Sequence, residues 1–142
     1  MSTIVTRTTK GSPLTHGELD ANFSNLNTDK AGHPTGKLEG GTIGQLTSKS
    51  TGVTLDKRCG QITMNNASLA ASTTVTFTMT NNKIAATDLL VLNHVSGGTP
   101  GAYTLNAQAA SGNVNINVRN VTAGALAEAI VIGFVVIKAA ID

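Results

Sequence analysis

Unbroken alternation of polar and apolar residues over two short segments constrains the fold of this chain more than any other feature. Threonines alternate with Val, Phe and Met in residues 74–80, and asparagines alternate with Val, Ile and Val in residues 113–119. Successive side chains of a β-strand point to opposite faces, so a period of two is typical of a strand with one buried and one exposed face. Both segments are therefore predicted to be half-buried antiparallel strands.

Two other segments are apolar at every position. Residues 89–92 read Leu-Leu-Val-Leu, and residues 130–137 are rich in the β-branched residues Ile and Val. Such runs predict strands in a sheet that is covered on both sides, or strands at a contact between subunits. Further strands are expected at 60–65 and 103–107, with Gly-, Asn- and Pro-containing turns between the segments. The sequence thus predicts a mainly β fold, an antiparallel, jelly-roll-like β-sandwich preceded by an extended N-terminal arm and one short helix.

The charged residues divide the chain into two zones. Residues 1–58 carry twelve of them and residues 59–142 carry six. A solvated N-terminal region followed by a weakly charged β domain is the simplest explanation. We therefore expect an arm, a short helix and a linker in residues 1–40, which serve for attachment, and a β-sandwich in residues 41–142, which serves for oligomerisation.

The N-terminal region carries one sharp helix signal. Thr15 followed by Glu18 matches a capping box, in which each side chain accepts a hydrogen bond from the other residue's backbone N–H, and a helix is expected over residues 15–27. A three-turn helix with one narrow apolar stripe is marginal by itself in water. It is therefore expected to dock on its own β domain, on copies of itself or on another protein. The predicted docking residues are Leu14, Leu19, Phe23 and Leu26.

Catalytic, cofactor and metal sites are not expected. The three histidines, His16, His33 and His94, have no metal-ligand spacing, and Cys59 has no base beside it in the sequence. No two carboxylates are placed together for general acid–base chemistry, and the Gly-rich segment 96–101 lacks the Lys-Ser/Thr ending of a phosphate-binding loop. The sequence predicts a non-enzymatic protein without a cofactor.

Charge and hydropathy also argue against two classes of partner. The net charge of +2 and a largest basic cluster of two residues, Lys57 and Arg58, are far from the clustered basic excess of nucleic-acid-binding proteins. The most apolar run, residues 129–137, is much shorter than the roughly 20 residues that a membrane helix needs. The start of the sequence lacks the apolar segment of a signal peptide, so export is not expected.

Self-association is the expected role of the β domain. Charged residues make up 13% of the chain, compared with about 25% in an average soluble domain. The Thr and Asn faces of the alternating strands are either ordinary solvent faces or faces that meet a symmetry copy without charge repulsion, and the doubly apolar last strand favours the second reading. The predicted oligomer-interface residues are Ile130, Ile132, Phe134 and Val136.

One segment resembles a known class of proteins. Residues 6–23 read TRTTKGSPLTHGELDANF. This segment resembles one found near the N-termini of virion proteins of tailed bacteriophages, tail fibres and related appendages in particular. The resemblance implies an attachment element that holds a small trimeric β module to the particle. From residue 41 onward, composition and strand patterning are similar to those of short phage structural proteins, including capsid decoration (cement) proteins.

The resemblance implies a virion protein made in the host cytoplasm, and two roles for it stay open. The first is a homotrimeric capsid decoration protein that binds the major capsid protein, or another virion protein, and stabilises the shell. The second is a short tail or head fibre, or an adaptor protein, whose β domain binds a receptor on the host surface. The sequence shows a single β domain without shaft repeats, which favours the first role.

Overall fold

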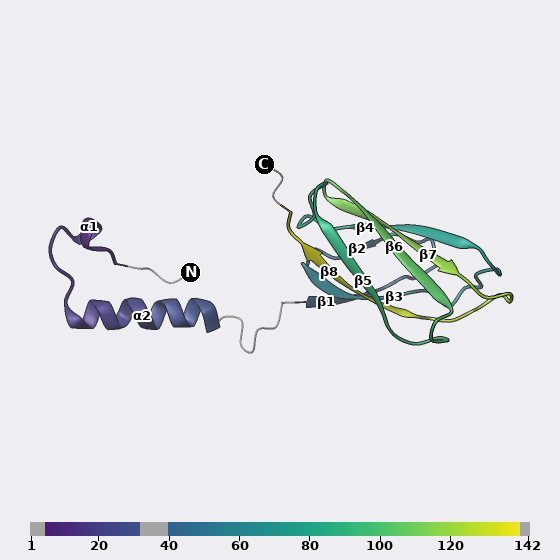
Figure 1. Ribbon diagram of the computed structural model, residues 1–142, viewed down its shortest axis with the longest axis horizontal. Coiled ribbons are helices and arrows are strands. Elements are labelled where there is room, and N and C mark those ends of the chain that lie inside the picture. The colour runs from purple at the N-terminus through teal and green to yellow at the C-terminus, as the bar shows by residue number, and fades with distance from the viewer. Residues whose placement is uncertain (1–4, 32–39, 140–142) are drawn as a thin grey trace. The chain divides into compact units, whose positions relative to one another are not determined.

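The computed structural model describes residues 5–31 and 40–139 of the chain (Figure 1). By its internal contacts the chain divides into two units, Met1–Leu38 and Glu39–Asp142. The first is helical and the second is a β-sandwich, so the predicted fold class is confirmed.

Within residues 5–31 the N-terminal unit holds two helices, α1 (Arg7–Lys10) and α2 (His16–Ala31). The prediction of an extended arm is wrong at residues 7–10, because the hydroxyl of Thr6 accepts a hydrogen bond from the backbone N–H of Thr9 (3.2 Å) and caps one helical turn. The predicted helix is confirmed, and it ends at Ala31 rather than at residue 27.

Eight strands form two four-stranded sheets, which Figure 1 shows stacked on each other. Their orders are β1-β3-β8-β5 and β2-β4-β7-β6. The strands are β1 (Gly40–Gly44), β2 (Val53–Thr54), β3 (Cys59–Thr63), β4 (Thr74–Thr80), β5 (Leu89–Ser96), β6 (Tyr103–Ala110), β7 (Asn113–Asn120) and β8 (Val131–Ile137).

The chain passes from one sheet to the other at every connection except the β6–β7 hairpin. This crossing gives the sandwich its jelly-roll-like character. It also brings β1 beside β3 and β2 beside β4 in parallel, whereas the other neighbours in both sheets are antiparallel. The sheets are therefore mixed at one edge each, because a chain that visits the opposite sheet between two strands returns in its original direction.

Alternate side chains of the facing strands fill the space between the sheets. The expected inward set of β4 and β7 is confirmed: Phe77 and Met79 are buried, and they lie among Val114, Ile116 and Val118. The rest of the buried hydrophobic cluster comes from β2, from the other sheet and from the connecting segments: Val53, Ile62, Met64, Ile84, Ile130, Ile132, Phe134 and Val136.

This core overturns the predicted oligomer interface. Ile130 and Ile132 are 0% exposed, and Phe134 and Val136 are almost as deeply buried within a single copy of the chain. The strand is apolar on both faces, and these side chains occupy the face that packs against β4 and β7. They stabilise the sandwich itself, so they are not available for contact with a second subunit.

Candidate functional site

In the N-terminal unit, Glu18 contacts both Thr15 and Lys10. Its carboxylate accepts hydrogen bonds from the Thr15 backbone N–H (2.7 Å) and hydroxyl (2.9 Å), and it forms an ion pair with Lys10. The Glu18 backbone N–H in turn donates to the Thr15 hydroxyl (3.3 Å), so the predicted capping box is confirmed. The Lys10 hydrogen bond, followed by those from Thr15, lowers the pKa of Glu18 to about 2.

A second contact ties the start of the chain to α2. The Asn22 amide accepts a hydrogen bond from the Val5 backbone N–H (2.9 Å) and donates to the Val5 carbonyl (2.7 Å). Lys10, Thr15, Glu18 and Asn22 all belong to the segment at residues 6–23, so its polar residues fold the arm back onto the helix. Sequence reasoning recognised the capping box and missed Lys10 and Asn22, whose partners lie eight and seventeen residues away.

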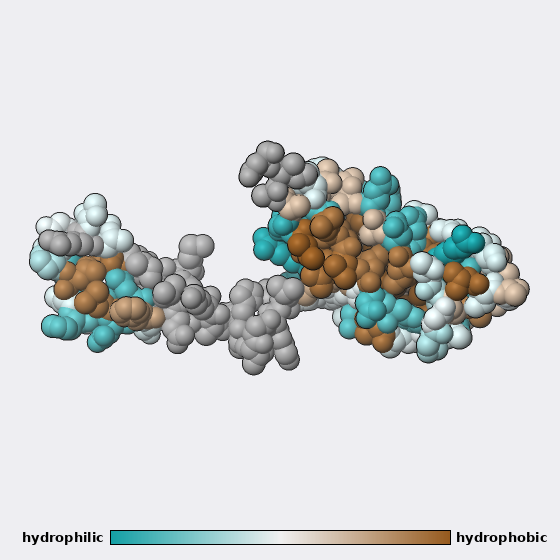
Figure 2. Space-filling model, viewed as in Figure 1, coloured by the Kyte–Doolittle hydropathy of each residue, from teal (hydrophilic) through white to brown (hydrophobic). Residues whose placement is uncertain are grey.

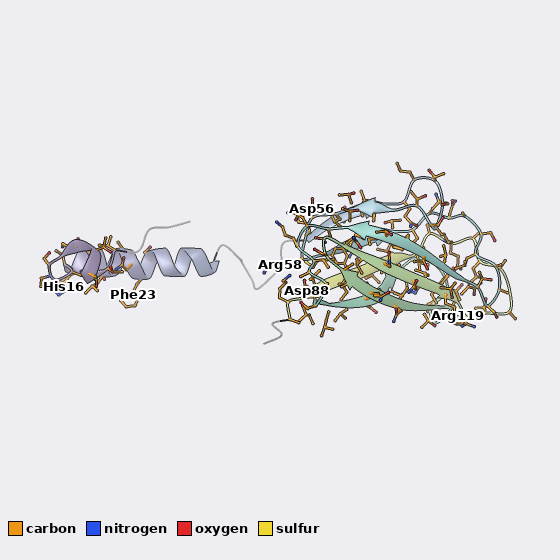
Figure 3. All side chains as sticks on the ribbon, turned by 90° about the horizontal axis from the view of Figure 1, so that it is seen from above. His16, Phe23, Asp56, Arg58, Asp88 and Arg119 are labelled. Atoms are coloured by element: carbon orange, nitrogen blue, oxygen red, sulfur yellow. The ribbon has the colours of Figure 1, made fainter. Side chains whose placement is uncertain are left out.

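The predicted docking residues belong to this unit, and the exposed fractions of their side chains differ. Phe23 is 70% exposed and projects from α2 (Figure 3), Leu19 is 41% exposed, and Leu14 is half-buried. Leu26 lies in α2, and its side chain falls outside the described part of the chain. The unit thus presents an exposed aromatic side chain on a capped helix. Such a side chain buries a large apolar area when it finds a partner.

The outer face of the β1-β3-β8-β5 sheet carries an apolar patch over β5 and β8 (Figure 2). The register places Leu89 beside Ile137 and Val91 beside Val135, so apolar side chains of two neighbouring strands form adjoining rows. Leu89 is 62% exposed and Val91 is 53% exposed. We call this surface the apolar face; it consists of Leu89, Val91, Val95, Val131, Val135 and Ile137, with the exposed Asn93 between Val91 and Val95.

The apolar face is hollowed at Gly133. A groove of about 640 Å³ runs across β1, β3, β8 and β5 there, with Cys59, Val91 and Val135 among its lining residues. A Cβ atom at Gly133 would lie 2.7 Å from a methyl group of Val95, so only glycine leaves room for the side chain that leans over it. Every lining residue within the described part of the chain is uncharged.

The outer face of the other sheet has the opposite character. The hydroxyl of Thr76 donates to the Asn117 side chain (2.6 Å), and that of Thr78 donates to the Asn115 side chain (2.9 Å). The predicted Thr and Asn faces are thus a single polar surface across β4 and β7, because their residues pair in register. At one end of this surface lies a groove of about 490 Å³; it is lined by Thr74, Thr104, Asn106, Asn117, Arg119 and Val121.

Glu128 organises a polar cluster that the sequence did not predict. Its carboxylate accepts hydrogen bonds from the Thr99 hydroxyl (2.6 Å) and backbone N–H (3.0 Å) and from the Tyr103 hydroxyl (2.8 Å). These bonds, that of the Thr99 hydroxyl first, lower the pKa of Glu128. Burial, and then the Glu128 contact, raise the pKa of Tyr103 well above its usual value. A carboxylate held charged and a phenol held protonated are poor proton carriers at neutral pH.

The Glu128 cluster fits a structural role. The buried ammonium of Lys49, whose pKa is lowered by burial, donates to the carbonyls of Asn65 (2.6 Å) and Glu128 (2.5 Å). Gly98 (φ 65°) lies so close to the cluster that a Cβ there would sit 2.7 Å from a Glu128 carboxylate oxygen. The cluster therefore holds the 96–101 loop against the segment before β8, and the loop acts as a connection between strands, as the sequence predicts.

The other candidate residues are dispersed. His16 lies at the start of α2, His94 lies on β5 edge-on to the Tyr103 ring, Cys59 is half-buried on β3, and His33 is outside the described residues. In residues 5–31 and 40–139 no three His, Cys, Asp or Glu side chains come together as metal ligands. None of the helices described is both long and apolar enough to cross a membrane.

The candidate functional surfaces are therefore three: the exposed side of α2, the apolar face and the polar groove. Comparisons of the chain with protein-family models, with curated proteins and with solved structures find no match.

Proposed function

We propose that this chain is a non-enzymatic structural protein of a tailed-phage virion, a homotrimeric capsid decoration protein that binds the major capsid protein and stabilises the shell. The observation that carries the proposal is the apolar face. This exposed surface without charged residues lies on the central strand β8 and the edge strand β5, and the rest of the sandwich surface is mainly polar. A cluster of exposed apolar side chains of this kind is typical of an interaction site.

The chemistry of the apolar face supports association with copies of itself. Residues near a threefold axis lie close to their own copies, and a surface without charged side chains can lie at that axis without repulsion. Burial of apolar area contributes roughly 25 cal/mol per Å², and the most exposed side chains, Leu89 and Val91, gain the most. These outward residues of β5 and β8 take the place of the buried residues that the sequence had suggested as the interface.

The N-terminal unit supports attachment to a second protein. Its polar residues hold a compact helical element in which Phe23 stays exposed, and its sequence is the part of the chain that resembles phage attachment segments. In the proposed arrangement this unit binds the major capsid protein while the sandwiches associate around a threefold axis. The shell is then stabilised because one trimer bridges neighbouring capsid subunits.

Two separate single variants test the association step, and each places one negative charge on the outer face of a different sheet. We expect Val91→Glu to convert a trimer into a monomer, because three buried carboxylates would face one another without partners. Gln108→Glu, on the exposed face of β6, is the matched control and should remain trimeric. Sedimentation equilibrium of the full chain and both variants gives the masses. A monomeric wild-type chain, or a trimeric Val91→Glu variant, would contradict the proposal.

A second candidate role has one observation in its favour. The polar groove at the end of the β2-β4-β7-β6 sheet offers hydrogen-bonding side chains on an exposed surface, as a receptor-binding domain requires. A short tail or head fibre, or an adaptor, would use this sheet to bind a receptor on the host surface. A decoration protein is present in many more copies per particle than a fibre, so the copy number distinguishes the two roles.

A further inference from the structure

The polar groove lies on the outer face of the β2-β4-β7-β6 sheet, where two rows of side chains cross three strands. The register places Arg119 of β7 between Thr74 of β4 and Thr104 of β6. In the next row, Asn117 lies between Thr76 and Asn106. One row therefore brings a guanidinium group between two hydroxyls, and the other brings two amides side by side.

Hydrogen bonds orient the amide row. The Thr76 hydroxyl donates to the Asn117 side-chain oxygen (2.6 Å), and the Asn117 side-chain nitrogen donates to the Asn106 side-chain oxygen (3.5 Å). This relay occupies the oxygen of Asn106, so the amide N–H groups of Asn106 are the donors left for a ligand. The groove thus presents oriented donors on a rigid sheet rather than on a loop, which lowers the entropic cost of binding.

Arg119 supplies the charge of the groove. Its side chain is exposed, and no carboxylate pairs with it among the residues that the structure describes. A guanidinium group binds a carboxylate through two parallel hydrogen bonds, which gives both energy and orientation. Val121, which is also exposed, adds an apolar surface at the rim of the groove.

From this arrangement we infer that the polar groove binds an acidic saccharide, with the carboxylate of a uronic or similar sugar acid on Arg119. Sugar hydroxyls both donate and accept hydrogen bonds, and the Thr hydroxyls and Asn amides of the groove do the same. The C–H face of a pyranose ring packs on an apolar rim such as Val121. The groove volume of about 490 Å³ is within the usual range of small-molecule sites.

Other ligand classes fit the groove less well. A nucleic acid requires several cationic contacts along its backbone, and among the described residues that line the groove only Arg119 is charged. A protein partner is usually anchored by buried aromatic side chains, and none of the lining residues that the structure describes is aromatic. The inference concerns the groove alone and holds for a decoration protein as well as for a fibre.

A titration of the full chain with a matched pair of saccharides tests the inference. The probes are the tetrasaccharide of galacturonic acid and its fully methyl-esterified form, which keeps the sugar rings and lacks the carboxylates. Binding is followed through the backbone amide signals in two-dimensional NMR spectra. We expect the acid to shift the signals of Thr74, Thr104, Asn106 and Arg119, and the ester to bind about tenfold more weakly or worse.

Three variants assign the effect to the groove. Arg119→Ala should lose about tenfold in affinity for the acid or more, and Arg119→Lys should retain part of it, because an ammonium keeps the charge and loses the paired geometry. Arg58→Ala is the control, because Arg58 is an exposed arginine at the opposite end of the sandwich (Figure 3).

Four outcomes would overturn the inference. They are no binding of the acid at millimolar concentration, equal binding of acid and ester, equal loss in Arg58→Ala and Arg119→Ala, and equally strong binding of inorganic phosphate or of a single-stranded oligonucleotide. Each is independent of the sedimentation result, because the groove and the apolar face lie on different sheets. Failure here therefore leaves the proposed assembly untouched.

Discussion

Among single residues, Glu18 joins the segment before α2 to the start of this helix through Lys10 and Thr15. Its pKa is lowered from an ordinary value of 4.5 to about 2 by Lys10 and Thr15, so its contacts stabilise the folded unit above pH 4.5. That contribution is lost as the pH falls from 4.5 towards 2, because the folded state must then take up a proton that the unfolded state already holds. We expect the first turn of α2 to fray over this interval.

The fraying is measured from the amide signals of Thr15 and Glu18 in NMR spectra recorded between pH 7 and pH 2. Glu18→Gln should fray at all pH values and lose the transition, because a neutral amide cannot pair with the Lys10 ammonium. Asp20→Asn removes a neighbouring helix carboxylate and should keep the transition. A transition that persists in Glu18→Gln would contradict this account of the unit.

Ile132 tests the reassignment of the last strand from interface to core. It is fully buried between the sheets, so Ile132→Ala should lower the free energy of unfolding by about 2–5 kcal/mol through lost burial and a residual cavity. Leu46→Ala, at a side chain that is 89% exposed, is the control and should change stability by less than about 0.5 kcal/mol. Urea unfolding monitored by circular dichroism measures both. Equal stability of the two variants would show that Ile132 is not a core residue.

Among the strands, the sequence predicted those whose two faces differ. Residues 74–80 and 113–119 alternate strictly, so hydrophobic burial leaves only one orientation for each strand. In β8 both faces are apolar, and the period of two no longer tells which one is buried. Ile132 and Val135 look equivalent in the sequence, although one is in the core and the other on the apolar face.

The short edge strands were harder to predict. β1 and β2 contain mostly small or polar residues, and their parallel pairing with β3 and β4 depends on long-range crossings that no local pattern encodes. The two grooves were likewise out of reach, because each combines residues from three or more strands. The sequence pointed to the Thr face and the Asn face as surfaces of interest. It did not show that the two strands pair with each other and join these faces into one surface.

Helix α2 is the element expected to carry attachment, and Phe23 is its most exposed large side chain among those described. We expect Phe23→Ser to abolish binding of the protein to capsids that lack it, while the circular-dichroism signal of the sandwich stays unchanged. The loss follows from the apolar area that a phenylalanine contributes at an interface. Leu46→Ser, which removes an exposed hydrophobic side chain from the sandwich, is the matched control and should bind. Normal binding of Phe23→Ser would contradict the docking role.

In the whole molecule, the two units differ in surface chemistry, and we propose that the first serves attachment and the second association. The N-terminal unit is rich in charge and is held by polar contacts, whereas the sandwich has few charges and keeps one outer face apolar and the other polar. A protein that coats a shell in many copies needs both a contact to the shell and a contact to its own copies. The arrangement of surfaces agrees with that requirement.

The copy number of this chain in purified virions tests the central claim most directly. Quantitative mass spectrometry, with peptides of the major capsid protein as the internal reference, gives the ratio of the two proteins. We expect a ratio close to one, because a decoration protein follows the symmetry of the shell. A few copies per particle would contradict decoration and favour the short fibre, and absence of the chain from the virion would contradict the proposed function altogether.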